Sequence, residues 1–124
     1  ERLLDFVGLS AHAATEAKNL NLINKKRLEM ARALATSPRL VMLDEVLGGL
    51  NSGEMAEALK LIRAIRDASG VTVLWIEHVM HALMSVVERV LVLHQGRLIC
   101  EGPPDAVVCD RGVIEAYLGE SEDD

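Results

Sequence analysis

Aromatic residues are scarce in this chain, which has one Phe, one Trp and one Tyr among 124 residues. Half of the residues are nevertheless hydrophobic, so the core must be built from aliphatic side chains. An aliphatic core is typical of helices packed on a parallel sheet, whose strands are buried on both faces. The length is enough for one domain with one core and too short for two.

Long apolar runs and closely spaced cysteines are also missing. No apolar run approaches the roughly 20 residues that a membrane span needs, and no signal-peptide pattern is visible. Cys100 and Cys109 are too far apart for a C-x-x-C motif, and no partner pair exists for a zinc site. Both lie in apolar contexts, so we expect reduced, buried thiols, which suit a cytosolic protein.

Basic residues are fewer than acidic ones: the chain has thirteen basic and nineteen acidic residues, and its net charge is -6. An acidic domain of this size is a poor candidate for binding nucleic-acid phosphates. We therefore interpret the run Lys25-Lys26-Arg27 as the solvated face of a helix.

The hydrophobic pattern predicts alternating strands and helices. Strands are expected at 40–44 and 71–76, and a hairpin is expected from 90–93 and 97–100 around His94-Gln95-Gly96. Helices are expected at 3–9, 25–36, 52–68, 80–87, 104–108 and 112–118. Asn24 and Asn51 are the expected N-caps, Gly70 the expected left-handed end, and the acidic tail 120–124 is expected to be frayed.

Strand, helix, strand, helix, strand is the pattern of an α/β sheet. The connection from 40–44 to 71–76 should be a right-handed crossover, which makes the two strands parallel. Ligands of such sheets gather at the carboxyl ends of the strands. Both polar clusters of interest follow a predicted strand there.

Asp44-Glu45 is the first polar cluster, placed directly after four aliphatic residues. Two carboxylates at the end of a buried strand suit a magnesium–nucleotide site, in which one acid holds the metal through water. The second acid can act as a general base toward an attacking water. Two acids that simply begin an exposed loop would give the same pattern.

His78 ends the second cluster, Trp75-Ile76-Glu77-His78. A histidine at the carboxyl end of a strand can donate a hydrogen bond to a terminal phosphate. A lone histidine is more often structural, and His12, His81 and His94 keep that interpretation.

The order of these features resembles the ABC ATPase family. A basic helix start (Lys25-Lys26-Arg27-Leu28-Glu29) is followed by the apolar strand with Asp44-Glu45, by Gly49-Leu50-Asn51, and by the strand ending in Glu77-His78. The closing segment Val113–Gly119 is similar to the subgroup that serves branched-chain amino acid uptake. The resemblance covers about residues 3–119 and is specific, since motif identity, spacing and order agree.

The resemblance implies a role for each matching position. Leu40–Glu45 corresponds to the Walker B strand, with Asp44 organising Mg²⁺ and Glu45 as the catalytic carboxylate. His78 corresponds to the switch histidine that contacts the γ-phosphate of ATP. Gly49 and Asn51 fall in the D-loop, and Asn21 and Ile23 fall in the signature region, so all four are expected to bind cofactor.

Three departures from the family pattern stand out. Ile23 occupies the position of a signature glycine, where a β-branched side chain is expected to obstruct the approach of a phosphate. Val46 replaces a common proline. No G-x-x-x-x-G-K-[ST] loop is present, so we expect the chain by itself neither to bind ATP tightly nor to hydrolyse it.

We therefore expect a partial P-loop NTPase sheet that lacks the Walker A strand and loop. Residues 1–24 would end a helical subdomain, 25–101 would form the α/β core, and 102–124 would form C-terminal helices and a tail. The chain opens at Glu1 and already has a helical pattern there, which is compatible with a fragment. The missing strand should leave apolar side chains open and cause poor solubility, swapping or oligomerisation.

The resemblance implies that the parent protein is an ATP hydrolase. Its partners would be a second ATPase subunit and a membrane permease, with no nucleic acid, and it would lie on the cytoplasmic face of the membrane. One alternative is a non-catalytic regulatory or interaction module derived from such an ATPase. Another is an ABC ATPase of a soluble DNA-repair or translation pathway.

Overall fold

The computed structural model describes residues 2–118, and the side chains of 2–117, and these divide into two compact units at 82/83. The described strands form two separate two-stranded ladders, one in each unit. Each unit has its own cluster of buried apolar side chains. The buried side chains are thus grouped in a cluster within each unit, where the sequence led to the expectation of one core.

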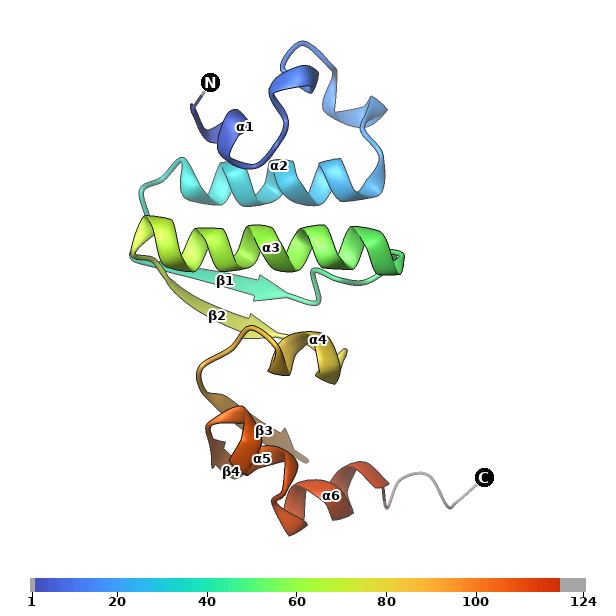
Figure 1. Ribbon diagram of the computed structural model, residues 1–124, viewed down its shortest axis with the longest axis vertical. Coiled ribbons are helices and arrows are strands. Elements are labelled where there is room, and N and C mark those ends of the chain that lie inside the picture. Colours follow the sequence, from blue (N-terminus) through green and yellow to red (C-terminus); the bar gives the residue numbers. More distant parts are fainter. Residues whose placement is uncertain (1, 119–124) are drawn as a thin grey trace. The chain divides into compact units, whose positions relative to one another are not determined.

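The first unit contains a parallel strand–helix–strand arrangement (Figure 1). Its elements are α1 (Arg2–Phe6), η1 (Ser10–His12), η2 (Ala17–Asn19), α2 (Leu22–Leu34), β1 (Leu40–Asp44), α3 (Ser52–Ser69) and β2 (Thr72–Ile76), and α4 (Met80–Met84) crosses the boundary between units. β1 and β2 pair in parallel from Leu40 with Thr72 to Asp44 with Ile76. The predicted parallel pairing is confirmed.

Helix α3 begins and ends as its sequence predicts. The Asn51 side chain accepts the Glu54 amide at 3.0 Å, and the Glu54 carboxylate accepts the Asn51 amide at 3.0 Å. Together these bonds form a capping box that pairs two amides otherwise left unpaired in the first turn. Gly70 ends the helix at φ 60°, in the left-handed region that glycine enters without strain.

Helix α2 starts at Leu22, earlier than its predicted start at Lys25. Its N-cap is Asn21, whose side chain accepts the Asn24 amide at 3.1 Å. Asn24 was the expected cap, but it lies inside the helix and is buried. Either asparagine suits a helix start by its residue type, so burial of the first turn decided between them.

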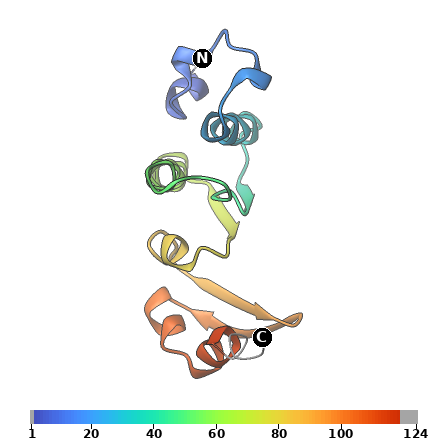
Figure 2. The ribbon, with the colours of Figure 1, turned by 90° about the vertical axis from the view of Figure 1, so that its right-hand side faces the viewer.

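One face of the β1–β2 sheet is covered and the other is open. Side chains alternate between the faces of a strand, and Val41 and Leu43 on β1 are buried. Figure 2 shows α3 on one side of the two strands. The opposite face exposes four large apolar side chains, of Leu40, Met42, Leu74 and Ile76. We call these four residues the open face.

The open face should make the isolated chain self-associate, because parallel sheets are normally buried on both faces. We expect the double variant M42K/I76K to lower the average mass in size-exclusion chromatography with light scattering. These side chains are 68% and 58% exposed, so the charges add little cost to folding. The control A56K/A68K adds the same charge at exposed positions of α3 and should leave the mass unchanged. An equal mass for both variants would assign the association to another surface.

The second unit is an antiparallel hairpin with two helices. β3 (Val90–His94) and β4 (Arg97–Gly102) pair as predicted, with a register shift between Val92 and Leu93. The turn residues Gln95 and Gly96 both have positive φ, of 47° and 75°, as a tight hairpin turn requires. Helices α5 (Pro104–Val108) and α6 (Arg111–Leu118) follow. The tail 120–124 lies outside the described residues.

The core of the second unit is aliphatic. Val90, Val92, Val107 and Val113 are buried together, and Cys100 packs against them. Burial raises the pKa of the Cys100 thiol, and the nearby Asp110 carboxylate adds to the rise. Both cysteines are free thiols, but Cys109 is exposed, so its predicted burial is wrong. It directly follows α5, where its side chain faces outward.

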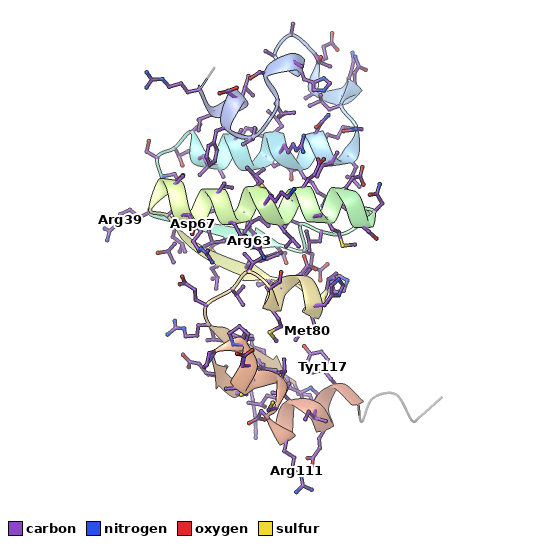
Figure 3. All side chains as sticks on the ribbon, in the orientation of Figure 1. Arg39, Arg63, Asp67, Met80, Arg111 and Tyr117 are labelled. Atoms are coloured by element: carbon purple, nitrogen blue, oxygen red, sulfur yellow. The ribbon has the colours of Figure 1, made fainter. Side chains whose placement is uncertain are left out.

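The surface of α6 carries a short ion pair. Arg111, which extends away from the helix in Figure 3, contacts Glu115 one turn later at 2.7 Å. Exposed pairs of this kind contribute little stability, since water and salt screen them. No helix in the described part of the chain is both long and apolar enough to span a membrane.

Candidate functional site

The parallel register brings the two polar clusters to one edge of the first unit's sheet. Asp44, the last residue of β1, pairs with Ile76, the last residue of β2. The Glu45 amide then donates to the Ile76 carbonyl at 2.8 Å. Because both strands run the same way, the residues that follow them emerge side by side.

Glu45 has an unusual backbone conformation, with φ at 47°. Few residues other than glycine adopt this left-handed region, and it costs on the order of 1 kcal/mol or more. The strain is located at the residue that ends the strand pairing, and the Glu45 side chain stays 61% exposed. A strained and exposed carboxylate at the carboxyl edge of a sheet is a candidate for function.

His78 lies next to Glu45, as the sequence predicts. Its Nδ1 is 3.6 Å from Glu45 Oε1, and the ring is 68% exposed. The separation is longer than a hydrogen bond, so the two groups are neighbours that face a common space. Asp44 is exposed on the same face of β1 as Leu40 and Met42. It therefore stands at the carboxyl end of the open face.

Glu77 was not singled out from the sequence, although it is the buried acid of this edge. Its side chain is 0% exposed. Oε2 accepts the Leu47 amide at 3.3 Å, and Oε1 accepts the His78 amide at 3.1 Å. The alternation of side chains along the strand could have identified it, because Glu77 follows Val73 and Trp75 at the inward positions of this strand and its extension.

The loop between β1 and α3 packs against the start of α2. Gly49 has φ at 79°, and a side chain there would meet Leu22 Cδ2 at 2.9 Å. Leu47 and Leu50 are buried in one cluster with Ile23. Asn51 is engaged in the capping box of α3, so the structure gives Gly49 and Asn51 defined packing and hydrogen-bonding roles.

The Ile23 side chain is turned into the core, where it is 6% exposed. The side chain is thus not exposed at the surface, and a contact of Ile23 with a ligand would have to use its backbone amide. That amide is in the first turn of α2, where amides lack helical partners. Leu22, the preceding residue, is the one with an exposed side chain. Asn21 is exposed and caps the helix.

Asn24 holds the segment before α2 to the helix. Its Oδ1 accepts from Arg27 Nη1 at 3.3 Å, and its Nδ2 lies 3.3 Å from His12 Nε2. Arg27 also forms an ion pair with Glu57 of α3. Arg27 therefore has a structural partner, whereas the sequence placed it on a solvated face. The position of Asn24 among these groups explains why a polar residue is buried here.

The two hollows found among the described residues of the first unit lie away from this edge. These hollows, of about 510 and 220 Å³, lie between α1 and the ends of α2 and α3, and between α3 and α4. Neither is lined by Asp44, Glu45 or His78. The described residues contain no group of three metal-binding side chains.

Comparison with known proteins shows a similarity to ATP-binding proteins of ABC transporters. The family described as "Branched-chain amino acid ATP-binding cassette transporter" matches residues 97–123. The branched-chain amino acid transport ATP-binding proteins LivG of Escherichia coli K12 and BraF of Pseudomonas aeruginosa are each 40% identical over 118 residues. These matches cover 95% of this chain. The crystal structure of MJ1267, an ATP-binding cassette of an ABC transporter, in its ADP conformation has a TM-score of 0.85 at 29% identity over 95% of this chain.

The chain is similar to ATP-binding cassettes of ABC transporters over about half of their length. It spans 46% of the length of LivG and of BraF and 48% of MJ1267. The resemblance inferred from the sequence is confirmed, and so is a partial P-loop fold. We call this chain, which spans about half of a cassette, the half-cassette.

Proposed function

We propose that this half-cassette belongs to an ATPase subunit that hydrolyses ATP to drive transport through a membrane permease. The observation that carries the proposal is the approach of His78 to Glu45 within 3.6 Å at the edge where β1 delivers Asp44. An acid for the metal, a general base and an imidazole for the terminal phosphate are the groups that phosphoryl transfer to water requires. Catalysis would depend mainly on positioning and charge stabilisation.

Each residue has one task in this proposal. Asp44 would hold Mg²⁺, which when bound neutralises charge on the phosphates of ATP. Glu45, exposed and close to the end of β1, would accept a proton from the attacking water. His78 would donate a hydrogen bond to the transferred phosphoryl group.

The open face supports the proposal that further protein completes the site. Asp44 shares this face with Leu40 and Met42, so a segment that covers the apolar side chains would also reach the metal-binding carboxylate. A phosphate-binding loop carried by that segment would lie beside Asp44. Asn21, Gly49, Asn51 and the backbone of Ile23 would contribute at the contact with a second ATPase subunit.

The proposed cargo is a branched-chain amino acid or a similar small solute. LivG and BraF are named for that transport, and the family match to residues 97–123 carries the same description. The lipopolysaccharide export protein LptB of Acidithiobacillus ferridurans is 37% identical over 120 residues, which makes export of a lipid the second candidate. The subunit would be peripheral on the cytoplasmic face, held there by the permease.

ATP binding distinguishes the half-cassette from a complete one. By calorimetry with Mg²⁺ and ATP, we expect no micromolar affinity for residues 1–124 alone, because the chain has no G-x-x-x-x-G-K-[ST] loop. A chimera that joins the N-terminal half of E. coli LivG to residues 1–124 should bind ATP and hydrolyse it. The LivG half alone is the control and should not hydrolyse ATP. Micromolar ATP affinity for residues 1–124 alone would contradict the proposal that ATP binding requires the N-terminal half of a cassette.

A further inference from the structure

The hydrogen-bonded ladder between β1 and β2 ends before the functional loop begins. The backbone bond from Glu45 to Ile76 is the last between the two segments. Beyond it, a hydrogen bond between the loop and the extension of β2 is made by the Glu77 carboxylate, which accepts the Leu47 amide. The Glu77 side chain therefore joins the two segments by a hydrogen bond beyond the point where backbone hydrogen bonds between them end.

Burial makes the Glu77 carboxylate effective in this position. A carboxylate removed from water must be compensated by hydrogen bonds, and Glu77 accepts from the backbone amides of Leu47 and His78. Those amides also need acceptors when water is excluded from them. Hydrogen bonds to an ionised acceptor are about twice as strong as neutral ones, so the three partners hold one another in place.

The same carboxylate faces the His78 ring. Glu77 Oε1, which accepts the His78 amide, lies 3.5 Å from the ring Nδ1, and Glu45 Oε1 lies 3.6 Å from it. With Nδ1 toward two carboxylates, the ring presents Nε2 to the opposite side. Glu77 thus touches both the loop that follows Glu45 and the imidazole that Glu45 faces.

We propose that Glu77 is a positioning residue, which fixes the loop 45–51 to the His78 segment and sets the orientation of the His78 ring. Its side chain is fully buried, so it does not touch substrate and acts through Leu47 and His78. The catalytic consequence rests on the function proposed above, whereas the structural role does not. The two are therefore tested by different measurements.

The structural role is tested in the 124-residue chain by amide hydrogen exchange, which does not require a monomer. In E77A, both amides lose their acceptor, and exchange at Leu47 should accelerate by about 10- to 100-fold. In E77Q, one oxygen is retained and the added NH₂ group cannot accept, so the acceleration should be smaller. Peptides covering 40–44 and 72–76 should keep wild-type protection in E77Q, which shows that the sheet is intact.

The orientation of the ring is tested by long-range ¹H–¹⁵N spectra of ¹⁵N-histidine protein. Wild type should show His78 with its proton on Nδ1, which faces both carboxylates, and E77A should shift the tautomer balance toward Nε2, because only the Glu45 carboxylate then faces Nδ1. The exposed residue Glu29 of α2 provides the matched control, because E29Q removes the same charge and should change neither readout. Wild-type exchange at Leu47 together with an unchanged His78 tautomer in E77A and E77Q would overturn the proposal.

Catalysis in the LivG chimera separates this inference from the proposed function. E77Q should lower kcat by about tenfold with little change in KM, as expected when a catalytic group is misplaced and binding is kept. An inactive wild-type chimera would refute the proposed function and leave the exchange result to decide on Glu77. An E77Q chimera with wild-type kcat would remove the catalytic part of the inference.

Discussion

The variant E45Q of the LivG chimera is expected to lose ATP turnover by at least about 100-fold, which is the usual contribution of a general base. Glutamine keeps the size of the side chain and cannot accept the proton of the attacking water. The Glu45 side chain is 61% exposed, so the change should not affect folding. ATP affinity, measured by calorimetry, should stay within about twofold, since the base acts only in the transition state.

Two variants make this result specific. E29Q removes an exposed carboxylate from α2 and should retain wild-type turnover. H78A should also reduce turnover, because the imidazole that faces Glu45 is lost. Undiminished hydrolysis by E45Q would remove Glu45 from the proposed role. It would also favour the alternative of a half-fold kept for regulation or interaction.

Replacing Ile23 with glycine, which would restore the family's residue, is expected to destabilise the chain by about 3–5 kcal/mol. Ile23 is 6% exposed and packs with Leu47 and Leu50, so the change opens a cavity under the loop that follows Glu45. Urea unfolding measures the loss, with Trp75 as reporter at a dilution at which the chain is monomeric. Trp75 is the single tryptophan and packs against the same cluster.

Leu22 provides the matched control for this variant. It is the adjacent residue of α2 and is 45% exposed, so L22G should cost only about 1 kcal/mol, near the helix penalty of glycine. The expected difference in unfolding free energy between the two variants comes from burial alone, since both substitutions put glycine into the first turn of the same helix. If L22G lost more unfolding free energy than I23G, the conclusion that Ile23 and not Leu22 packs in the core would be contradicted. The family resemblance alone would suggest that glycine at residue 23 improves the protein.

Local sequence was sufficient for most elements. The apolar runs 40–43 and 71–76 predicted the two strands, and Asn51 with Glu54 specified the start of α3. The start of α2 was missed because Asn21 and Asn24 are equally good caps in isolation. Burial of Asn24 beside His12 and Arg27 is a tertiary fact that propensity does not contain.

The same limit applies to the candidate site. The two strands were predicted to be parallel, so Asp44-Glu45 and His78, which follow them, were predicted to lie at the same edge of the sheet. The structure confirms this placement. Exposure of the side chains was not predictable to the same degree. Ile23 and Leu22 are both large and apolar, and only packing turned the first inward and the second outward.

By itself, the sequence determined the order of strands and helices, the parallel crossover and the residues that follow each strand, because these depend on periodicity and on short-range hydrogen bonds. The tertiary structure decided that the chain forms two compact units, that one sheet face stays open, and that Glu77 is the buried acid. These features depend on which surfaces meet. A linear pattern of residue types does not specify which surfaces meet when several of them are apolar.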